Sequence, residues 1–223
     1  MQEHTESAHT QRTLKIRGRG VSSADPDLTI LSFGAVRRTP SYSASVEELN
    51  ERVEPLRVDL EAAGVERTQL KTTSFDVRTD RRYDRDKDEY VFLGYEASHR
   101  LILELSFDKE LLIRVLGRVA RGASESTVKI SFDVSDRESL RRQAMRAAVA
   151  DAHQSARVLA EASGVTLGEI AYIDYSFVEI HTRRLSYELA DRGAAYDAAS
   201  STPDVEPEAL KAEEGVTIVW EVS

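Results

Sequence analysis

Residues 91–105 read VFLGYEASHRLILEL, the clearest run of period two in the chain. Apolar side chains occupy every second position, with His99 among them, and charged residues such as Glu96 and Arg100 lie between them. This alternation is typical of a β-strand with one buried face. Residues 71–77 alternate in the same way, and a charged segment separates the two runs. The sequence therefore predicts a long β-hairpin.

Further strands and helices are predicted on both sides of this hairpin. Residues 28–38 are apolar on both faces, which predicts a central, covered strand. In the helical segments, apolar positions recur at three- and four-residue steps. We expect strands at 12–20, 28–38, 128–134, 170–180 and 216–222, and helices at 45–63, 108–122 and 136–163. This order predicts an α+β fold with antiparallel sheets and packed helices.

Local signals predict where some elements end. Gly18 and Gly20 are expected to end the first strand. Ser45 and Glu48 have the spacing of a capping box, which predicts a helix start at Ser45. Pro55 predicts a kink or a restart within that helix, because a mid-helix proline removes a hydrogen bond.

The longest predicted helix presents small residues on one face, among them Ala148 and Ala152. A face of this kind allows a helix to approach a sheet closely, and a larger side chain there has no room. Arg141 lies near the start of the same helix, and we expect it to point to solvent.

The chain is long enough for one or two structural units. Residues 1–11 are polar and predict a disordered tail, whereas 12–223 are expected to form one domain. A helix followed by Gly-Val and a strand occurs twice, with Gly-Val at 64–65 and at 164–165. Two related halves, 12–106 and 107–223, are therefore expected.

Composition argues against several functional classes. The 223 residues carry a formal net charge of −9, which disfavours binding to phosphate backbones, and contain no cysteine for a disulfide or a thiolate nucleophile. The N-terminus has neither the basic start nor the apolar run of a signal peptide, and no later stretch approaches the roughly 18 apolar residues of a membrane span. We expect a cytoplasmic protein that binds no nucleic acid and does not insert into membranes. The alternative is a cell-envelope or periplasmic protein whose export signal lies outside this sequence.

Four blocks of the sequence carry a family resemblance. They are Ile16-Arg17-Gly18-Arg19-Gly20 with Pro26-Asp27, Gly94-Tyr95-Glu96-Ala97-Ser98, the segment 132–170, and Glu214-Gly215-Val216-Thr217-Ile218. These blocks resemble the SIMPL-domain family, a group of mostly bacterial proteins without an agreed molecular activity. The resemblance covers about residues 13–222. It implies an α+β fold with antiparallel sheet, a frequent place in the cell envelope, and self-association, and it supplies no catalytic residues.

The charged hairpin tip contains the strongest local hint of a metal site. Residues 84–88 have the alternate carboxylates of a calcium loop, but the EF-hand pattern also needs Gly and Glu where this chain has Glu89 and Tyr95. Five basic side chains oppose five acidic ones between 78 and 89, which favours a solvated, self-neutralising tip. Zinc-hydrolase, P-loop and serine-hydrolase motifs are missing from the sequence. We therefore designate no catalytic residue and expect neither metal nor cofactor.

Our leading interpretation is a non-enzymatic, oligomeric binding or scaffold protein, because long strands leave edges that another subunit can pair with. We expect the hairpin tip to contribute to self-association through Arg81, Arg82, Asp84, Arg85 and Asp86. Two alternatives stay open. One is a small-molecule binder that uses the aromatic residues of 172–177 and Trp220, and the other is an enzyme with a carboxylate-based site beside the connection 182–213.

Overall fold

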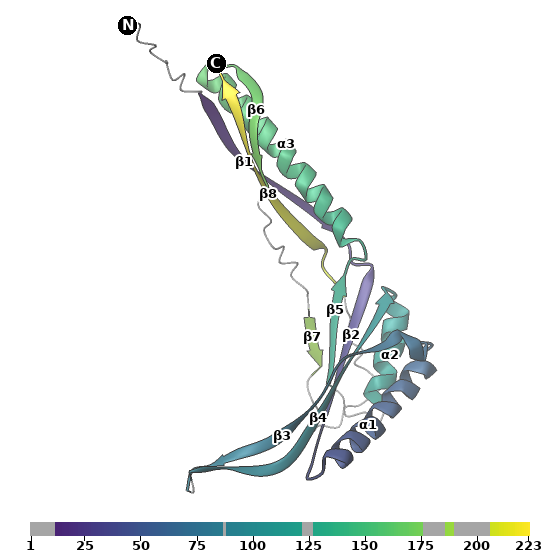
Figure 1. Ribbon diagram of the computed structural model, residues 1–223. Helices are drawn as coiled ribbons and strands as arrows, with labels where there is room; N and C mark the ends of the chain where they lie inside the picture. The colour runs from purple at the N-terminus through teal and green to yellow at the C-terminus, as the bar shows by residue number, and fades with distance from the viewer. Residues whose placement is uncertain (1–11, 87, 122–126, 176–185, 190–205) are drawn as a thin grey trace. The chain divides into compact units, whose positions relative to one another are not determined.

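The computed structural model describes residues 12–86, 88–121, 127–175, 186–189 and 206–223 (Figure 1). The described chain is α+β, with helices packed on two antiparallel sheets, as predicted. It divides into two compact units that are both discontinuous in sequence. Unit 1 comprises 1–25, 136–183 and 209–223, and unit 2 comprises 26–135 and 184–208. The predicted tail, 1–11, lies outside the described residues.

These units divide the chain at other places than the expected halves 12–106 and 107–223, because unit 2 is inserted into the sequence of unit 1. The predicted repeat nevertheless falls once in each unit. The Gly-Val pair at 64–65 follows a helix of unit 2, and the pair at 164–165 follows a helix of unit 1.

A five-stranded antiparallel sheet is the frame of unit 2, in the order β3-β4-β2-β5-β7. Strand β2 (Leu28–Thr39) lies in the middle, as its two apolar faces predicted. The predicted hairpin consists of β3 (Leu70–Asp84) and β4 (Glu89–Ser106). On the other side of β2 lie β5 (Thr127–Asp133) and β7 (Ser186–Leu189).

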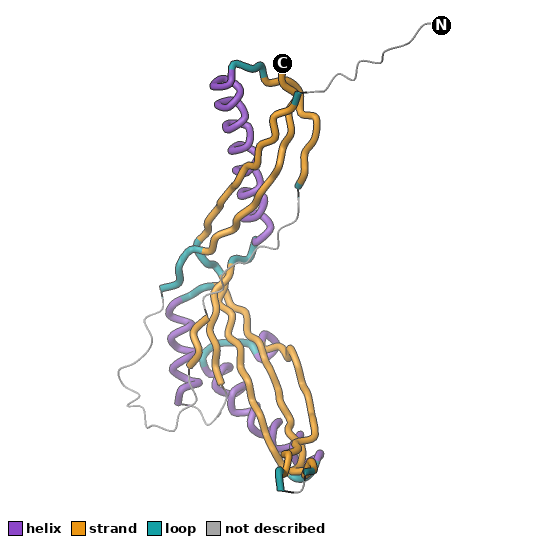
Figure 2. Tube along the Cα trace, turned by 90° about the vertical axis from the view of Figure 1, so that its left-hand side faces the viewer, coloured by secondary structure: helices purple, strands orange, loops and turns teal. Residues whose placement is uncertain are grey.

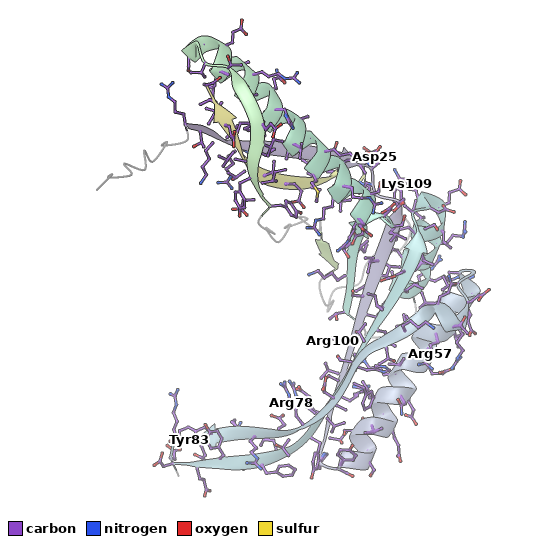
Figure 3. The ribbon with its side chains drawn as sticks, turned by 45° about the horizontal axis from the view of Figure 1, so that its top comes forward. Asp25, Arg57, Arg78, Tyr83, Arg100 and Lys109 are labelled. Atoms are coloured by element: carbon purple, nitrogen blue, oxygen red, sulfur yellow. The ribbon has the colours of Figure 1, made fainter. Side chains whose placement is uncertain are left out.

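Helices α1 (Tyr42–Ala62) and α2 (Lys109–Arg121) cover one face of this sheet (Figures 1 and 2). Alternate side chains of β4, such as Ala97, Leu101 and Leu103, are buried beneath them in one apolar core. The residues between them face the other way. Figure 3 shows Arg100 on the opposite side of the sheet from Arg57 of α1. Among the described helices, none has the length and apolar composition needed to cross a membrane.

Helix α1 differs from the prediction at its start, and it does not restart at Pro55. Its N-cap is Ser41, and Ser45 lies buried in the first turn, where its hydroxyl donates to the backbone oxygen of Tyr42. The predicted capping box is therefore wrong. The helix continues through Pro55, because its neighbour Leu56 is fully buried and packing in the core outweighs the lost hydrogen bond. A 3₁₀ turn, η1 (Arg67–Gln69), then leads into β3.

Unit 1 contains a three-stranded antiparallel sheet of β1 (Thr13–Ala24), β8 (Leu210–Val222) and β6 (Leu167–Asp174). The last strand in sequence, β8, lies between the other two. Helix α3 (Arg137–Ser163) runs along one face of the sheet, as Figure 2 shows. Its ends are as predicted: Asp136 accepts a hydrogen bond from the Ser139 amide, and Gly164 has a left-handed φ of 66°.

The two glycines of β1 do not end the strand, contrary to prediction, because their role is to admit α3. A Cβ on Gly18 would lie 2.1 Å from the backbone oxygen of Ala148, and one on Gly20 would lie 2.0 Å from that of Ala144. The small face of α3 is fully buried at these positions, as predicted. Helix and strand therefore meet backbone to backbone, and the Arg19 amide even donates to a side-chain oxygen of Asp151 on α3 at 2.9 Å.

Candidate functional site: the β3–β4 arm

The strand pairing shows where the hairpin leaves the sheet of unit 2. Strand β4 pairs with β2 from Ser106 back to Tyr95, whose partner Thr39 is the last residue of β2. Strands β3 and β4 continue to pair as far as Asp84 and Glu89. Residues 80–84 and 89–94 therefore form a two-stranded ribbon beyond β2, which we call the arm (Figure 1). Within the residues that the structure describes, neither outer backbone edge of the arm has a strand partner.

One side of the arm carries a row of aromatic side chains. Tyr83 and Tyr90 are cross-strand partners with ring centroids 5.2 Å apart. Phe92 meets Tyr95 edge to face at 5.3 Å, and Tyr95 meets Tyr42 of α1 in the same way at 5.7 Å. We call these five residues the aromatic stripe. Tyr90 is 70% exposed, Tyr42 56% and Phe92 49%, so the stripe presents a large apolar surface to solvent.

Gly94 fixes the base of the arm. Its φ is +141°, a conformation that side-chain-bearing residues rarely adopt, and a Cβ there would lie 2.4 Å from the backbone oxygen of Thr39. The pairing register of β3 and β4 shifts at the same place, between Asp80 and Arg81. Gly94 opens the block 94–98 that carries part of the family resemblance. The geometry gives that block a physical role: it sets the point at which the hairpin leaves the sheet.

Glu96, a buried carboxylate, ties the strands together at this base. Arg38 Nε donates to Glu96 Oε2 at 2.6 Å, and Arg78 Nη2 lies 2.5 Å from Oε1. Burial alone would raise the pKa of Glu96, but hydrogen bonds and charge from the two guanidinium groups hold that pKa below its ordinary value. Arg38 also lies 3.6 Å from Asp80. The cluster joins β2, β3 and β4, and its ionised carboxylate is suited to a structural role.

Comparison with known proteins places this fold in a family. Residues 14–220 match the family model SIMPL, described as a protein of unknown function (DUF541). The chain belongs to the SIMPL family. Relatives of this SIMPL protein include the 26 kDa periplasmic immunogenic proteins of Brucella abortus (strain S19) and Brucella melitensis biotype 1, each 28% identical over 170 residues. Each match covers 72% of this chain and 65% of the Brucella protein, so the chain spans just under two thirds of those relatives' length.

The tip residues named from the sequence lie at the far end of the arm of this SIMPL protein, where Figure 3 labels Tyr83. Arg81, Arg82 and Asp84 belong to β3, and Arg85 and Asp86 follow in the turn. Arg81, Arg82, Arg85 and Asp86 are exposed, and Asp84 is partly buried and accepts a hydrogen bond from the Asp86 amide at 3.0 Å. None of the three arginines forms an ion pair with another described residue, so their guanidinium groups can bind carboxylates of another molecule.

The calcium-like spacing of the tip does not produce a cluster of ligands in the described chain. No group of three or more histidine, aspartate or glutamate side chains there is placed to hold a metal ion. The Asp88 carboxylate instead accepts a hydrogen bond from the Tyr83 hydroxyl. The expectation that the SIMPL protein has no metal stays a prediction.

A second polar cluster lies in unit 1 and was missed from the sequence. Arg141 Nε donates to Glu214 Oε1 at 2.8 Å, and the Tyr175 hydroxyl donates to Glu214 Oε2 at 3.0 Å. The Glu214 side chain is 0% exposed. The expectation that Arg141 points to solvent is therefore wrong, because the buried carboxylate of β8 draws the guanidinium inward. The only sequence signal was Glu214 at an apolar position of a strand with period two.

The aromatic residues proposed for a small-molecule site do not gather in one place. Trp220 is 2% exposed and packs against His153 of α3, whereas Tyr172 is 60% exposed and pairs with Val219, which faces the other way. Tyr175 belongs to the cluster with Glu214. Phe177 lies outside the described residues.

His99 is a partnered core histidine, as its place on the apolar face of β4 suggested. It is 6% exposed, its Nε2 lies 2.9 Å from Thr72 Oγ1, and its ring meets that of Phe75 edge to face. Burial, and to a smaller extent the charge of Arg57, lowers the pKa of His99. The histidine therefore stays neutral in the folded core.

Proposed function

We propose that this SIMPL protein is a non-enzymatic binding or scaffold protein that assembles with copies of itself through the β3–β4 arm. The observation that carries the proposal is the arm itself: a two-stranded ribbon beyond the sheet, with exposed aromatic rings along one side and unpaired backbone edges.

The energetics of such a surface favour association. An exposed strand edge presents a row of backbone donors and acceptors to which another chain can add. Tyrosine and phenylalanine are enriched at protein interfaces, because they bury much area with few rotatable bonds. An aromatic residue that becomes fully buried contributes about 1.5–3 kcal/mol. Burial of Tyr83, Tyr90 and Phe92 would therefore supply a large part of the free energy of a micromolar complex, about 8 kcal/mol.

Charges at the tip add specificity and salt dependence. Arg81, Arg82 and Arg85 are without ion-pair partners in the described chain and are available to carboxylates of another subunit. Ion pairs between exposed groups are screened by salt, so high ionic strength should weaken assembly without abolishing it.

The carboxylate chemistry supports binding over catalysis. A general acid needs a raised pKa, whereas arginine partners lower the pKa of Glu96 and of Glu213. Glu214 is fully enclosed, with both oxygens hydrogen-bonded within the protein. The Arg141–Tyr175–Glu214 cluster therefore supports a structural role.

The compartment that fits this proposal is the cell envelope. The two Brucella relatives are described as periplasmic. We propose that this SIMPL protein acts there as well, which replaces our first expectation of a cytoplasmic location with the envelope alternative.

Assembly can be tested by light scattering after size exclusion at micromolar concentration. The parent protein should have a mass of two or more times the 24.9 kDa chain mass. The double variant Tyr90→Ser/Phe92→Ser should run as a monomer, because it removes the centre of the aromatic stripe. Val58→Ser, which changes an apolar residue of α1 that is 54% exposed, is the matched control and should assemble like the parent.

A parent protein that stays at the chain mass over a tenfold range of concentration would eliminate the assembly proposal. An arm variant that keeps the parent's mass would eliminate the arm as the interface.

A further inference from the structure

Strand β6 is an edge strand of unit 1 with an unusually apolar exposed surface. Ile170, Tyr172 and Ile173 are 42%, 60% and 53% exposed. Two of them belong to the side of the sheet that α3 covers: Ile170 pairs with Trp220 and Ile173 pairs with Ile218, both of which are core residues. The apolar surface of this sheet therefore continues onto β6 beyond the area that the helix buries.

The backbone of β6 is also open. β6 pairs with β8 along one side only, since it ends the order β1-β8-β6. Within the described residues, no strand lies along its other side. An edge that is both apolar and unpaired is the usual acceptor for an added strand.

Charge distinguishes β6 from the opposite edge of the same sheet. Residues 167–174 contain two acidic side chains, Glu169 and Asp174, and no basic one. Strand β1, the other edge, carries Lys15, Arg17 and Arg19 on its exposed positions. Exposed arginines of another chain would therefore be attracted to β6 and repelled by Lys15 and Arg17 of β1.

The outer strand of the arm has the complementary character. Its residues 80–84 place the exposed Arg81 and Arg82 between Asp80, which lies 3.6 Å from Arg38, and Asp84, which accepts a hydrogen bond from the Asp86 amide. Neither arginine forms an ion pair with another described residue, and the exposed Tyr83 follows them. This strand is an edge of the sheet of unit 2, so its backbone is open as well. Its arginines match Glu169 of β6, and the aromatic stripe beside it matches the exposed isoleucines.

We propose that the outer edge of β6 is the acceptor for the arm of a second copy of this chain. This inference rests on the proposed function, which it extends by naming the surface that the arm binds. Each copy then donates an arm and accepts one, and the arm and β6 are different surfaces. Such contacts close into a dimer when two copies exchange arms reciprocally, and otherwise form rings or filaments. An arm-to-arm contact across a twofold axis instead joins identical surfaces and ends at a dimer.

A mixing experiment separates these arrangements. Ile173→Lys disables the acceptor and leaves the arm intact, whereas Tyr90→Ser/Phe92→Ser disables the arm and leaves the acceptor intact. Each variant alone should be a monomer at 24.9 kDa. An equimolar mixture should form a complex of twice that mass, because one working arm meets one working acceptor. Val158→Lys, at an α3 residue that is 58% exposed, is the matched control and should assemble like the parent.

A second variant guards against misfolding of the first. Glu169→Lys changes only an exposed charge of β6, and it should raise the dissociation constant by about tenfold at low salt. The inference is overturned if Ile173→Lys and Glu169→Lys both assemble like the parent, or if the two monomeric variants do not combine. If the parent protein assembles but one of these two results is found, the β6 inference fails and the proposal of assembly through the arm stands. If the parent protein is a monomer, both the arm proposal and the β6 inference fail.

Discussion

Replacing Arg141 by alanine should destabilise unit 1, because the guanidinium is the charged partner of a carboxylate that has no access to solvent. The Glu214 side chain is 0% exposed, and it loses its 2.8 Å contact with Arg141 Nε in the variant. Tyr175 still donates to Oε2 but cannot neutralise the charge. Breaking a buried ion pair in this way costs typically about 3–5 kcal/mol.

The cost should be at or somewhat below the lower limit of this range, since the Arg141 side chain is 28% exposed and water can enter the space that it leaves. We therefore expect a loss of about 2–3 kcal/mol. For a protein of this length the melting temperature falls by about 2–4 °C per kcal/mol, so the expected decrease is roughly 4–12 °C.

Thermal denaturation followed by circular dichroism measures this decrease. The matched control is Arg142→Ala, because Arg142 is 51% exposed and its one ion pair within the described residues is with Glu138 on the same helix at 3.0 Å. It should lose no more than about 0.5 kcal/mol. Adding Glu214→Gln to the Arg141→Ala variant should restore part of the stability, since the buried charge is then gone. Equal melting temperatures for Arg141→Ala and Arg142→Ala would refute the reasoning.

Three further variants examine the core. Gly20→Ala should lower the free energy of unfolding by about 3 kcal/mol or more in urea denaturation, because the new Cβ would lie 2.0 Å from the Ala144 backbone oxygen. Gly117→Ala is the control and should be neutral or slightly stabilising, because its Cβ would meet a flexible side chain at 3.7 Å. Ala148→Leu should cost about 1–3 kcal/mol, since Ala148 is 0% exposed beneath the same sheet; urea midpoints equal to the parent's would contradict it. Folding lowers the pKa of His99. As the pH falls below about 6.5, the imidazole is therefore protonated in the unfolded chain before it is protonated in the folded one, and the protein loses stability. Compared with His99→Gln, the parent should therefore lose more stability between pH 7.5 and pH 5.5, and parallel pH profiles would exclude the histidine as the cause.

The regular elements could be predicted because their hydrophobic periods match single structural environments. From Ala97 to Ser106, strand β4 alternates between buried and more exposed positions, and α3 has a signal at each end, Asp136 and Gly164. Predictions failed where tertiary packing outweighed a local signal. Gly18 and Gly20 look like strand terminators, but the approach of a helix from a distant part of the sequence requires them. Pro55 looks like a break, but the helix continues through it, with buried residues such as Leu56 beside it.

The candidate site was predicted in part. The length of the hairpin and its charged tip were visible in the sequence, and they led to residues 81–86. The aromatic stripe was not, because Tyr42 is far from the hairpin in sequence and the face on which Phe92 lies depends on a register shift at the arm's base. Arg141 was misplaced for a related reason: its partner, Glu214, comes from a strand 73 positions later in the chain.

The central place of β8 in the sheet of unit 1 has a consequence for folding during synthesis. Residues 26–135 supply every described helix and strand of unit 2 except β7, and they emerge from the ribosome while β1 still lacks its neighbour. Neither β1 nor β6 can pair until residues 210–222 are available, since both bond to β8 and not to each other. Unit 2 can thus form its core early, as domains generally do in the order of translation. Unit 1 must wait for one of the last segments of this chain, and until then the small face of α3 and the glycines of β1 have no sheet on which to assemble.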